Sequence, residues 1–120
     1  MSREIKFRAW HKKYKEMYEV TCIDWEAEFV WVKYYDDDRE EWFSREEHFA
    51  DLELMQYTGL KDKNGVEIYE YSELDSAYEV IFKDLKYSLR HIPNNDIIDL
   101  HDYWRDKNGE IEVTREYTKV

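Results

Sequence analysis

The Asn64-Gly65 dipeptide, set between two alternating segments, limits the possible folds more than any other feature of this chain. Residues 54–59 before it and residues 66–71 after it alternate with the period of two that is typical of β-strands. Asn-Gly is favoured in two-residue hairpin turns, because both central residues of such a turn adopt a positive φ at little cost. We therefore expect a β-hairpin whose turn is formed by Asn64 and Gly65.

Further alternating segments predict a mostly antiparallel β-structure. Strands are expected at residues 5–9, 17–23 and 28–35, which would form a meander, and at residues 78–82 and 87–92. A second Asn-Gly, Asn108-Gly109, predicts a C-terminal hairpin. Ser44 and Glu47 have the spacing of a capping box and predict a short helix through Phe49 and Leu52. The predicted class is α+β, with one or two short helices.

Two blocks of the sequence closely resemble the YopX family of bacteriophage and prophage proteins. They are LMQYTGLKDKNGVEIYE at residues 54–70 and REIKFRAW at residues 3–10. The resemblance implies a phage or prophage protein of the bacterial cytoplasm and a small β-barrel that follows residues 54–70. It implies no particular activity, because the family has no established one. Where the family typically continues with Gly-Asp-Ile-Val, this chain has Tyr71-Ser72-Glu73-Leu74.

The length of 120 residues favours one domain. We expect residues 1–58 to form the meander and a short helix, and residues 59–120 to form a barrel-like part and the C-terminal hairpin. Five Trp and eleven Tyr supply apolar area to a chain that is 39% charged, and some are expected at the surface or in an interface. The single cysteine, Cys22, is expected to be a buried strand residue.

No apolar run is long enough to cross a bilayer and no leader opens the chain, so we expect a soluble cytoplasmic protein without a membrane partner. The net charge is −11. Residues 24–47 contain ten acidic side chains and only three basic ones. This composition argues against direct nucleic-acid binding, which needs clustered Lys and Arg for phosphate contacts.

An acidic run in a predicted loop is the candidate surface for a basic host or phage protein. It also has a simpler explanation, because a high net charge keeps proteins soluble. A lysine-rich segment, Lys12, Lys13 and Lys15, could pair with this run in another copy of the chain, and we expect a homo-oligomer. The candidate partner-binding residues are Asp36, Asp37, Asp38, Glu40 and Glu41.

Catalytic motifs are missing from the sequence: it has no P-loop, no dinucleotide-binding glycines, no nucleophile elbow and no paired cysteines. Asp99 and His101 could share a divalent metal if they lay on one face of a strand. Alternatively they form the polar side of an amphipathic strand or helix whose Ile97, Ile98 and Leu100 point inward. We expect no catalytic residues, no metal and no cofactor.

Three functional hypotheses follow, and the first is favoured. It is a non-enzymatic, self-assembling protein that contacts a host or phage macromolecule through an acidic, aromatic surface. The second is a small-molecule-binding or sequestering protein, with a pocket formed by Arg8, Trp10, Trp31 and Tyr57. The third is a metal-dependent enzyme that uses His101.

Overall fold

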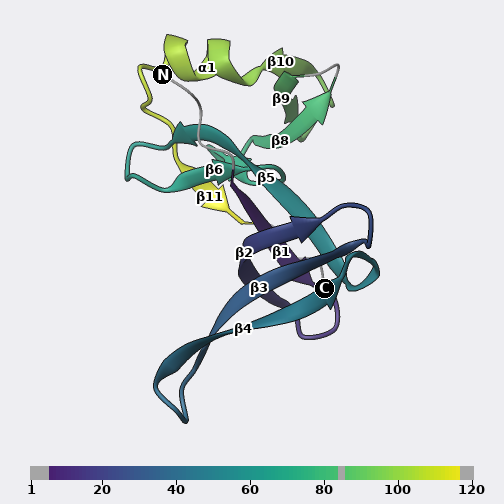
Figure 1. Ribbon diagram of the computed structural model, residues 1–120. Helices are drawn as coiled ribbons and strands as arrows, with labels where there is room; N and C mark the ends of the chain where they lie inside the picture. Colours follow the sequence, from purple (N-terminus) through teal and green to yellow (C-terminus); the bar gives the residue numbers. More distant parts are fainter. Residues whose placement is uncertain (1–5, 84–85, 117–120) are drawn as a thin grey trace. The chain divides into compact units, whose positions relative to one another are not determined.

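A computed structural model describes residues 6–83 and 86–116, which form two compact units (Figure 1). The N-terminal unit consists of residues 6–56 and the C-terminal unit of residues 57–116. Antiparallel strands dominate both units, and one α-helix and one 3₁₀ turn complete the described secondary structure. The predicted α+β class is confirmed. Among the described residues, no helix has the length and apolar character needed to span a membrane.

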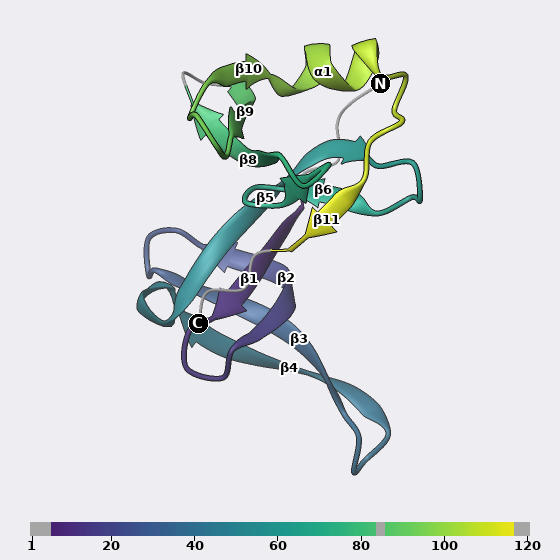
Figure 2. The same cartoon turned by 180° about the vertical axis from the view of Figure 1, so that it is seen from behind.

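The N-terminal unit is an antiparallel sheet in the order β4-β3-β2-β1-β5 (Figure 2). Its first three strands form the predicted meander, although Ile5, the first residue of the predicted strand 5–9, lies outside the described residues. The elements are β1 (Phe7–His11), β2 (Glu16–Asp24), β3 (Phe29–Asp36), β4 (Glu41–His48), the 3₁₀ turn η1 (Phe49–Asp51) and the first half of β5 (Leu52–Lys61).

One face of this sheet carries the core of the unit. Strand alternation places Val30 and Val32 of β3 on that face, where both are fully buried against Ala9 and Tyr18. The intervening side chains point to the opposite face, so Trp31 and Tyr35 are 39% and 46% exposed. Aromatic side chains at the surface were expected from the composition, and this expectation is confirmed.

The helix predicted from the capping box of Ser44 and Glu47 is wrong. These residues lie in β4, where Ser44 pairs with Lys33 and Glu47 pairs with Val30. Pairing along the whole length of β3 outweighs the local helix-start signal, since the strand can place every second side chain against the core. The segment at Phe49 that follows forms only the 3₁₀ turn.

Cys22 lies in a strand, as predicted, but it is exposed rather than buried. The β2–β3 register shifts between Val20, which pairs with Val32, and Cys22, which pairs with Trp31. This bulge inserts one residue, Thr21, and so turns Cys22 to the outer face of the sheet. A strict alternation from Val20 would have placed the thiol in the core.

The C-terminal unit contains an open sheet in the order β10-β9-β8-β7-β11, rather than the closed barrel that the family resemblance implied. The second half of β5 forms a separate hairpin with β6. The remaining elements are β6 (Glu67–Tyr69), β7 (Glu73–Leu74), β8 (Tyr78–Lys83), β9 (Lys86–His91), β10 (Ile97–Asp99), α1 (Leu100–Asp106) and β11 (Val113–Arg115).

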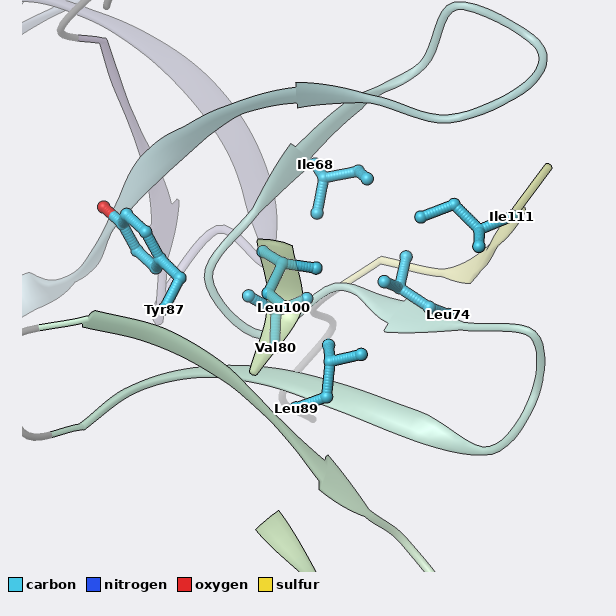
Figure 3. Packing of buried hydrophobic residues seen from close by; sticks show 7 residues of the cluster. All are labelled: Ile68, Leu74, Val80, Tyr87, Leu89, Leu100 and Ile111. Carbon is cyan, nitrogen blue, oxygen red and sulfur yellow. The ribbon is translucent and has the colours of Figure 1, made fainter. Parts of the chain in front are cut away.

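The core of the C-terminal unit is mostly aliphatic. Figure 3 shows seven of its side chains, which come from four strands, the helix and the segment before β11. All seven are at most 2% exposed, so this unit excludes water from its centre far more completely than the small N-terminal core does. They are Ile68, Leu74, Val80, Tyr87, Leu89, Leu100 and Ile111.

The hairpin predicted at Asn64-Gly65 exists, but the predicted turn type is wrong. Five residues, 62–66, connect β5 to β6, and Gly65 has a positive φ of +80° whereas Asn64 does not. The buried Asp62 carboxylate organises this loop by accepting hydrogen bonds from the backbone N–H groups of Asn64, Val66 and Val113 at 2.8–2.9 Å. Burial alone raises the pKa of Asp62, but these hydrogen bonds lower it below its usual value.

The second Asn-Gly pair ends a helix and does not form the predicted C-terminal hairpin. Asn108 and Gly109 both have positive φ, and they follow α1. The Gly109 N–H donates to the Trp104 carbonyl at 2.9 Å and the Asn108 N–H donates to the Arg105 carbonyl at 3.0 Å. This pair of bonds is the Schellman arrangement, which satisfies the last carbonyls of a helix.

Candidate functional site

A cleft of about 420 Å³ opens in the N-terminal unit where β2 and β3 part. The two strands are paired only from Glu19 and Lys33 onward. Before that point β2 pairs with β1, and beyond it β3 pairs with β4, so the two pairs of strands diverge. The lining residues come from β2, β3 and β4: Glu16, Met17, Tyr18, Glu19, Lys33, Tyr34, Tyr35, Trp42 and Arg45.

Two exposed aromatic rings belong to the lining of the cleft. Tyr35 and Trp42 are directly paired across β3 and β4, and their ring centroids are 5.3 Å apart at an angle of 63°. Trp42 is 59% exposed. The Lys33 ammonium lies 4.7 Å from the centroid of the Trp42 ring, which shows that this indole face accepts a cation.

Arg45 forms a second part of the cleft and is already fully engaged. Its guanidinium lies 4.7–5.1 Å from the ring centroids of Tyr14, Tyr18 and Tyr34. It also donates to Glu47 Oε1 at 2.6 Å and to the Tyr18 hydroxyl at 2.8 Å. Burial lowers the pKa of Arg45, but the hydrogen bonds to Glu47 and Tyr18 raise it overall, so the cation is permanent.

A chain of hydrogen bonds fixes Arg45 from behind. The buried His11 has its Nε2 3.0 Å from Glu47 Oε2, while its Nδ1 accepts the backbone N–H groups of Lys13 and Tyr14 at 3.2 Å. Because Nδ1 is an acceptor, the ring proton is on Nε2 and is donated to Glu47. Both ring nitrogens of His11 therefore hold the scaffold.

Two carboxylates, Glu16 and Glu19, line the cleft. Glu16 accepts a hydrogen bond from the Tyr18 hydroxyl at 2.8 Å; burial, followed by this bond, raises the pKa of Tyr18. Within residues 6–83 and 86–116, neither Glu16 nor Glu19 forms an ion pair, and both are exposed. Since Glu47 neutralises Arg45, the cleft retains two carboxylates and one ammonium.

The residues predicted to form a small-molecule pocket are not among those lining this cleft. Arg8 and Trp10 are buried side chains of β1, and Trp31 is on the outer face of β3. Tyr57 belongs to the C-terminal unit, where its ring lies 5.4 Å from that of Tyr69. The β3–β4 hairpin was not predicted, because residues 44–47 carry a local helix-start signal. Aromatic residues at positions 31, 35 and 42 were a usable signal for it.

The predicted acidic segment forms the tip of the β3–β4 hairpin. Asp36 has a structural role there, since its Oδ1 accepts the backbone N–H groups of Asp38 and Arg39 at 3.0 and 3.2 Å. The other four carboxylates are exposed and available to a partner. They are Asp37, Asp38, Glu40 and Glu41.

Asp99 and His101 lie at the start of α1. Asp99 is the N-cap: its Oδ1 accepts the Asp102 N–H at 3.0 Å, and its Oδ2 lies 3.4 Å from Lys86 Nζ. The hydrogen bond from the Asp102 N–H lowers the pKa of Asp99, and the nearby Lys86 lowers it further. Burial acts in the opposite direction but is outweighed. The described residues contain no group of three or more His, Cys, Asp or Glu that could hold a metal. The inward orientation predicted for three apolar neighbours is right for Leu100 but wrong for Ile97 and Ile98, which are 42% and 37% exposed on the edge strand β10.

Comparisons with known proteins support the family assignment and the fold. A family model described as YopX protein matches residues 6–114. The chain is similar to the crystal structure of protein EF1440 from Enterococcus faecalis, with 23% identity, a TM-score of 0.65, and coverage of 96% of this chain and 94% of that one. At this identity the likeness shows a shared fold. No curated protein matches the chain.

Proposed function

The chain belongs to the YopX protein family, and we propose that it is a non-enzymatic phage or prophage accessory protein that acts through protein–protein contacts in the bacterial cytoplasm. The observation that carries this proposal is the β3–β4 hairpin. It exposes Trp31, Tyr35 and Trp42 on one face and four carboxylates at its tip. The proposed partner is a host or phage protein with a basic surface.

The chemistry of the hairpin supports a protein partner. Trp and Tyr are the side chains most enriched in the energetic centres of protein interfaces, where they bury large area at a low cost in conformational entropy. The carboxylates around them would speed the encounter with a basic surface and exclude acidic partners. Residues 24–47 carry a net of seven negative charges, so the same segment supplies both features.

Photo-crosslinking tests this proposal. A crosslinking amino acid at Glu46, on the outer face beside Trp31, is used to capture proteins from a bacterial lysate with the wild-type sequence elsewhere and with Tyr35→Ala/Trp42→Ala. We expect a basic protein whose capture falls with the double variant and with rising salt. Phe82→Ala, which removes an exposed aromatic side chain of the C-terminal unit, is the matched control. Capture that is insensitive to the double variant would overturn the proposal.

Self-association is a second part of the proposal. Lys12, Lys13 and Lys15 are exposed in the turn between β1 and β2, and they could contact the acidic hairpin tip of another copy. Light scattering coupled to size exclusion, at micromolar concentration in low and high salt, measures the mass. We expect a mass that is a multiple of the chain mass. Salt should weaken the association only modestly if buried aromatic side chains dominate the contact. A mass of 15.0 kDa in both conditions would contradict self-assembly.

Binding of a small ligand is the alternative function, and the cleft beside Trp42 favours it. Its volume of about 420 Å³ lies within the range of ligand pockets, and it combines aromatic rings with a few charged groups.

A further inference from the structure

We propose that the cleft between β2 and the β3–β4 hairpin binds an organic cation, namely a guanidinium or alkylammonium group. The group would lie between the rings of Tyr35 and Trp42 and the carboxylates of Glu16 and Glu19. This inference deepens the proposed function and rests on it, because the natural source of the cation would be an Arg or Lys side chain of the basic partner.

The aromatic lining is the first support for a cation. Rings attract cations through their faces, and the protein already uses this interaction twice within the cleft. Arg45 lies among the rings of Tyr14, Tyr18 and Tyr34, and the Lys33 ammonium lies over Trp42. Tyr35 and Trp42 remain 46% and 59% exposed, so ring surface is still open to a further cation.

The charge balance is the second support. Arg45 is paired with Glu47 and is held by Tyr18, so its charge is already neutralised. Glu16 and Glu19 are the carboxylates of the cleft, and in the described parts of the chain neither has an ion-pair partner. A bound cation would supply the missing positive charge, and the acidic tip of the hairpin would attract it from a distance.

Lys33 allows the sign of the ligand charge to be tested. It is the one lining cation without a carboxylate partner among the described residues, and it would oppose an incoming cation but attract an anion. Replacing Lys33 with Met therefore strengthens binding if the ligand is a cation and weakens it if the ligand is an anion. Replacing Glu19 with Gln has the opposite effects.

The experiment is a titration of isotope-labelled protein, followed by NMR, with N-acetyl-arginine amide and separately with benzoate. We expect saturable shifts with the arginine amide at the indole N–H of Trp42 and the amides of Lys33 and Tyr35. Glu19→Gln should weaken this binding about twofold to fivefold, the scale of an exposed charge pair, and Lys33→Met should strengthen it by a similar factor. Trp42→Ala should weaken it about fivefold.

Glu46→Gln is the control, because it removes a carboxylate from the same outer face, opposite Trp31 and away from the cleft lining. It should leave binding of the arginine amide unchanged. Equal effects of Glu19→Gln and Glu46→Gln would reduce the site to a diffuse negative surface and overturn the inference. Tighter binding of benzoate than of the arginine amide, weakened by Lys33→Met, would overturn it as well.

A second arm separates the source of the cation. Butylguanidinium, a free guanidinium compound with a single positive charge, is compared with a blocked peptide that carries one Arg among neutral residues. Tighter binding of the peptide supports a side chain of a protein as the natural ligand, whereas tighter binding of butylguanidinium overturns that assignment. Cleft binding of the arginine amide without any crosslinked partner would reject the docking function alone, and a crosslinked partner indifferent to Glu19→Gln would reject the cleft alone.

Discussion

The two units of this protein distribute their apolar side chains in opposite ways. The C-terminal unit buries six aliphatic side chains completely, among them Leu89 and Leu100, and its helix covers part of that core. The core cluster of the N-terminal unit contains only three fully buried apolar residues, Ala9, Val30 and Val32. Three of the five tryptophans are instead exposed in this unit: Trp25, Trp31 and Trp42.

This contrast indicates a division of tasks. The C-terminal unit gains its stability mainly from removing aliphatic surface from water. The N-terminal unit supplements a small core with a hydrogen-bonded network, in which Arg45, Glu47 and His11 are central. We expect its exposed aromatic residues to contribute little to that stability and to be available for binding.

The largest effect should come from the aliphatic core. Leu89→Ala removes a fully buried side chain and should lower the free energy of unfolding by about 2–5 kcal/mol. Ile98 pairs directly with Leu89 across β9 and β10 but is 37% exposed, so Ile98→Ala is a matched control that should cost clearly less. Urea unfolding followed by circular dichroism measures both. Equal losses would show that the C-terminal unit does not depend on this core.

The next effect concerns the polar network of the N-terminal unit. Arg45→Met leaves the partly buried Glu47 without its guanidinium partner and removes the cation among three tyrosine rings. We expect a loss of about 1–3 kcal/mol in urea unfolding. Arg39→Met, at the exposed hairpin tip, is the control and should change stability little. If both variants have the free energy of unfolding of the wild type, the hydrogen-bonded network does not stabilise the N-terminal unit.

Much of the fold could be predicted because apolar and polar residues alternate along most of the strands. The segments that became β2, β3, β8 and β9 were recognised to within two residues at each end, and the hairpin at Gly65 was placed correctly. The wrong predictions concern segments whose structure is determined by contacts between residues far apart in the sequence. Ser44 and Glu47 form a local helix signal, but β3 recruits them into a strand. A single inserted residue turned Cys22 outward.

The candidate site was harder to predict than the fold. Its cleft exists because β2 and β3 stop pairing beyond Glu19 and Lys33, and such a register is a property of the assembled sheet.

The Asn-Gly dipeptide occurs twice in this chain and has a different structural role each time. It lies in a loop at Gly65, and it caps a helix at Gly109, where the preceding residues 100–106 have helical geometry.

The third prediction concerns Asp62 and tests how much a buried polar group stabilises the C-terminal unit. In Asp62→Asn the amide NH₂ would face the Val113 N–H, so one buried donor would lose its acceptor. We expect a loss of about 1–2 kcal/mol at neutral pH. Asp106→Asn, on the exposed end of α1, is the control.

The sign of the pH dependence follows from the lowered pKa of Asp62 in the folded protein. The folded state favours the ionised carboxylate, so its contribution is complete above the ordinary Asp value of 3.8 and disappears as the pH falls through the folded pKa. The difference in stability between wild type and Asp62→Asn should therefore shrink below pH 3.8. A difference that stays constant down to pH 2, ~2 units below the ordinary value, would contradict this assignment.

The smallest effect on stability should come from the residue on which binding depends most. Trp42 is 59% exposed and contacts chiefly Tyr35 and Lys33, so Trp42→Ala should change the free energy of unfolding by about 0.5 kcal/mol or less. Trp42→Ala should also weaken binding of the arginine amide and capture of the partner. The reason is that the Trp42 indole belongs both to the cleft and to the proposed partner-binding face of the β3–β4 hairpin. Urea unfolding and the NMR titration on one sample measure the two effects together. A loss of stability comparable to that of Leu89→Ala would show that the exposed aromatics of the N-terminal unit are structural after all, and the contrast between the two units would no longer hold.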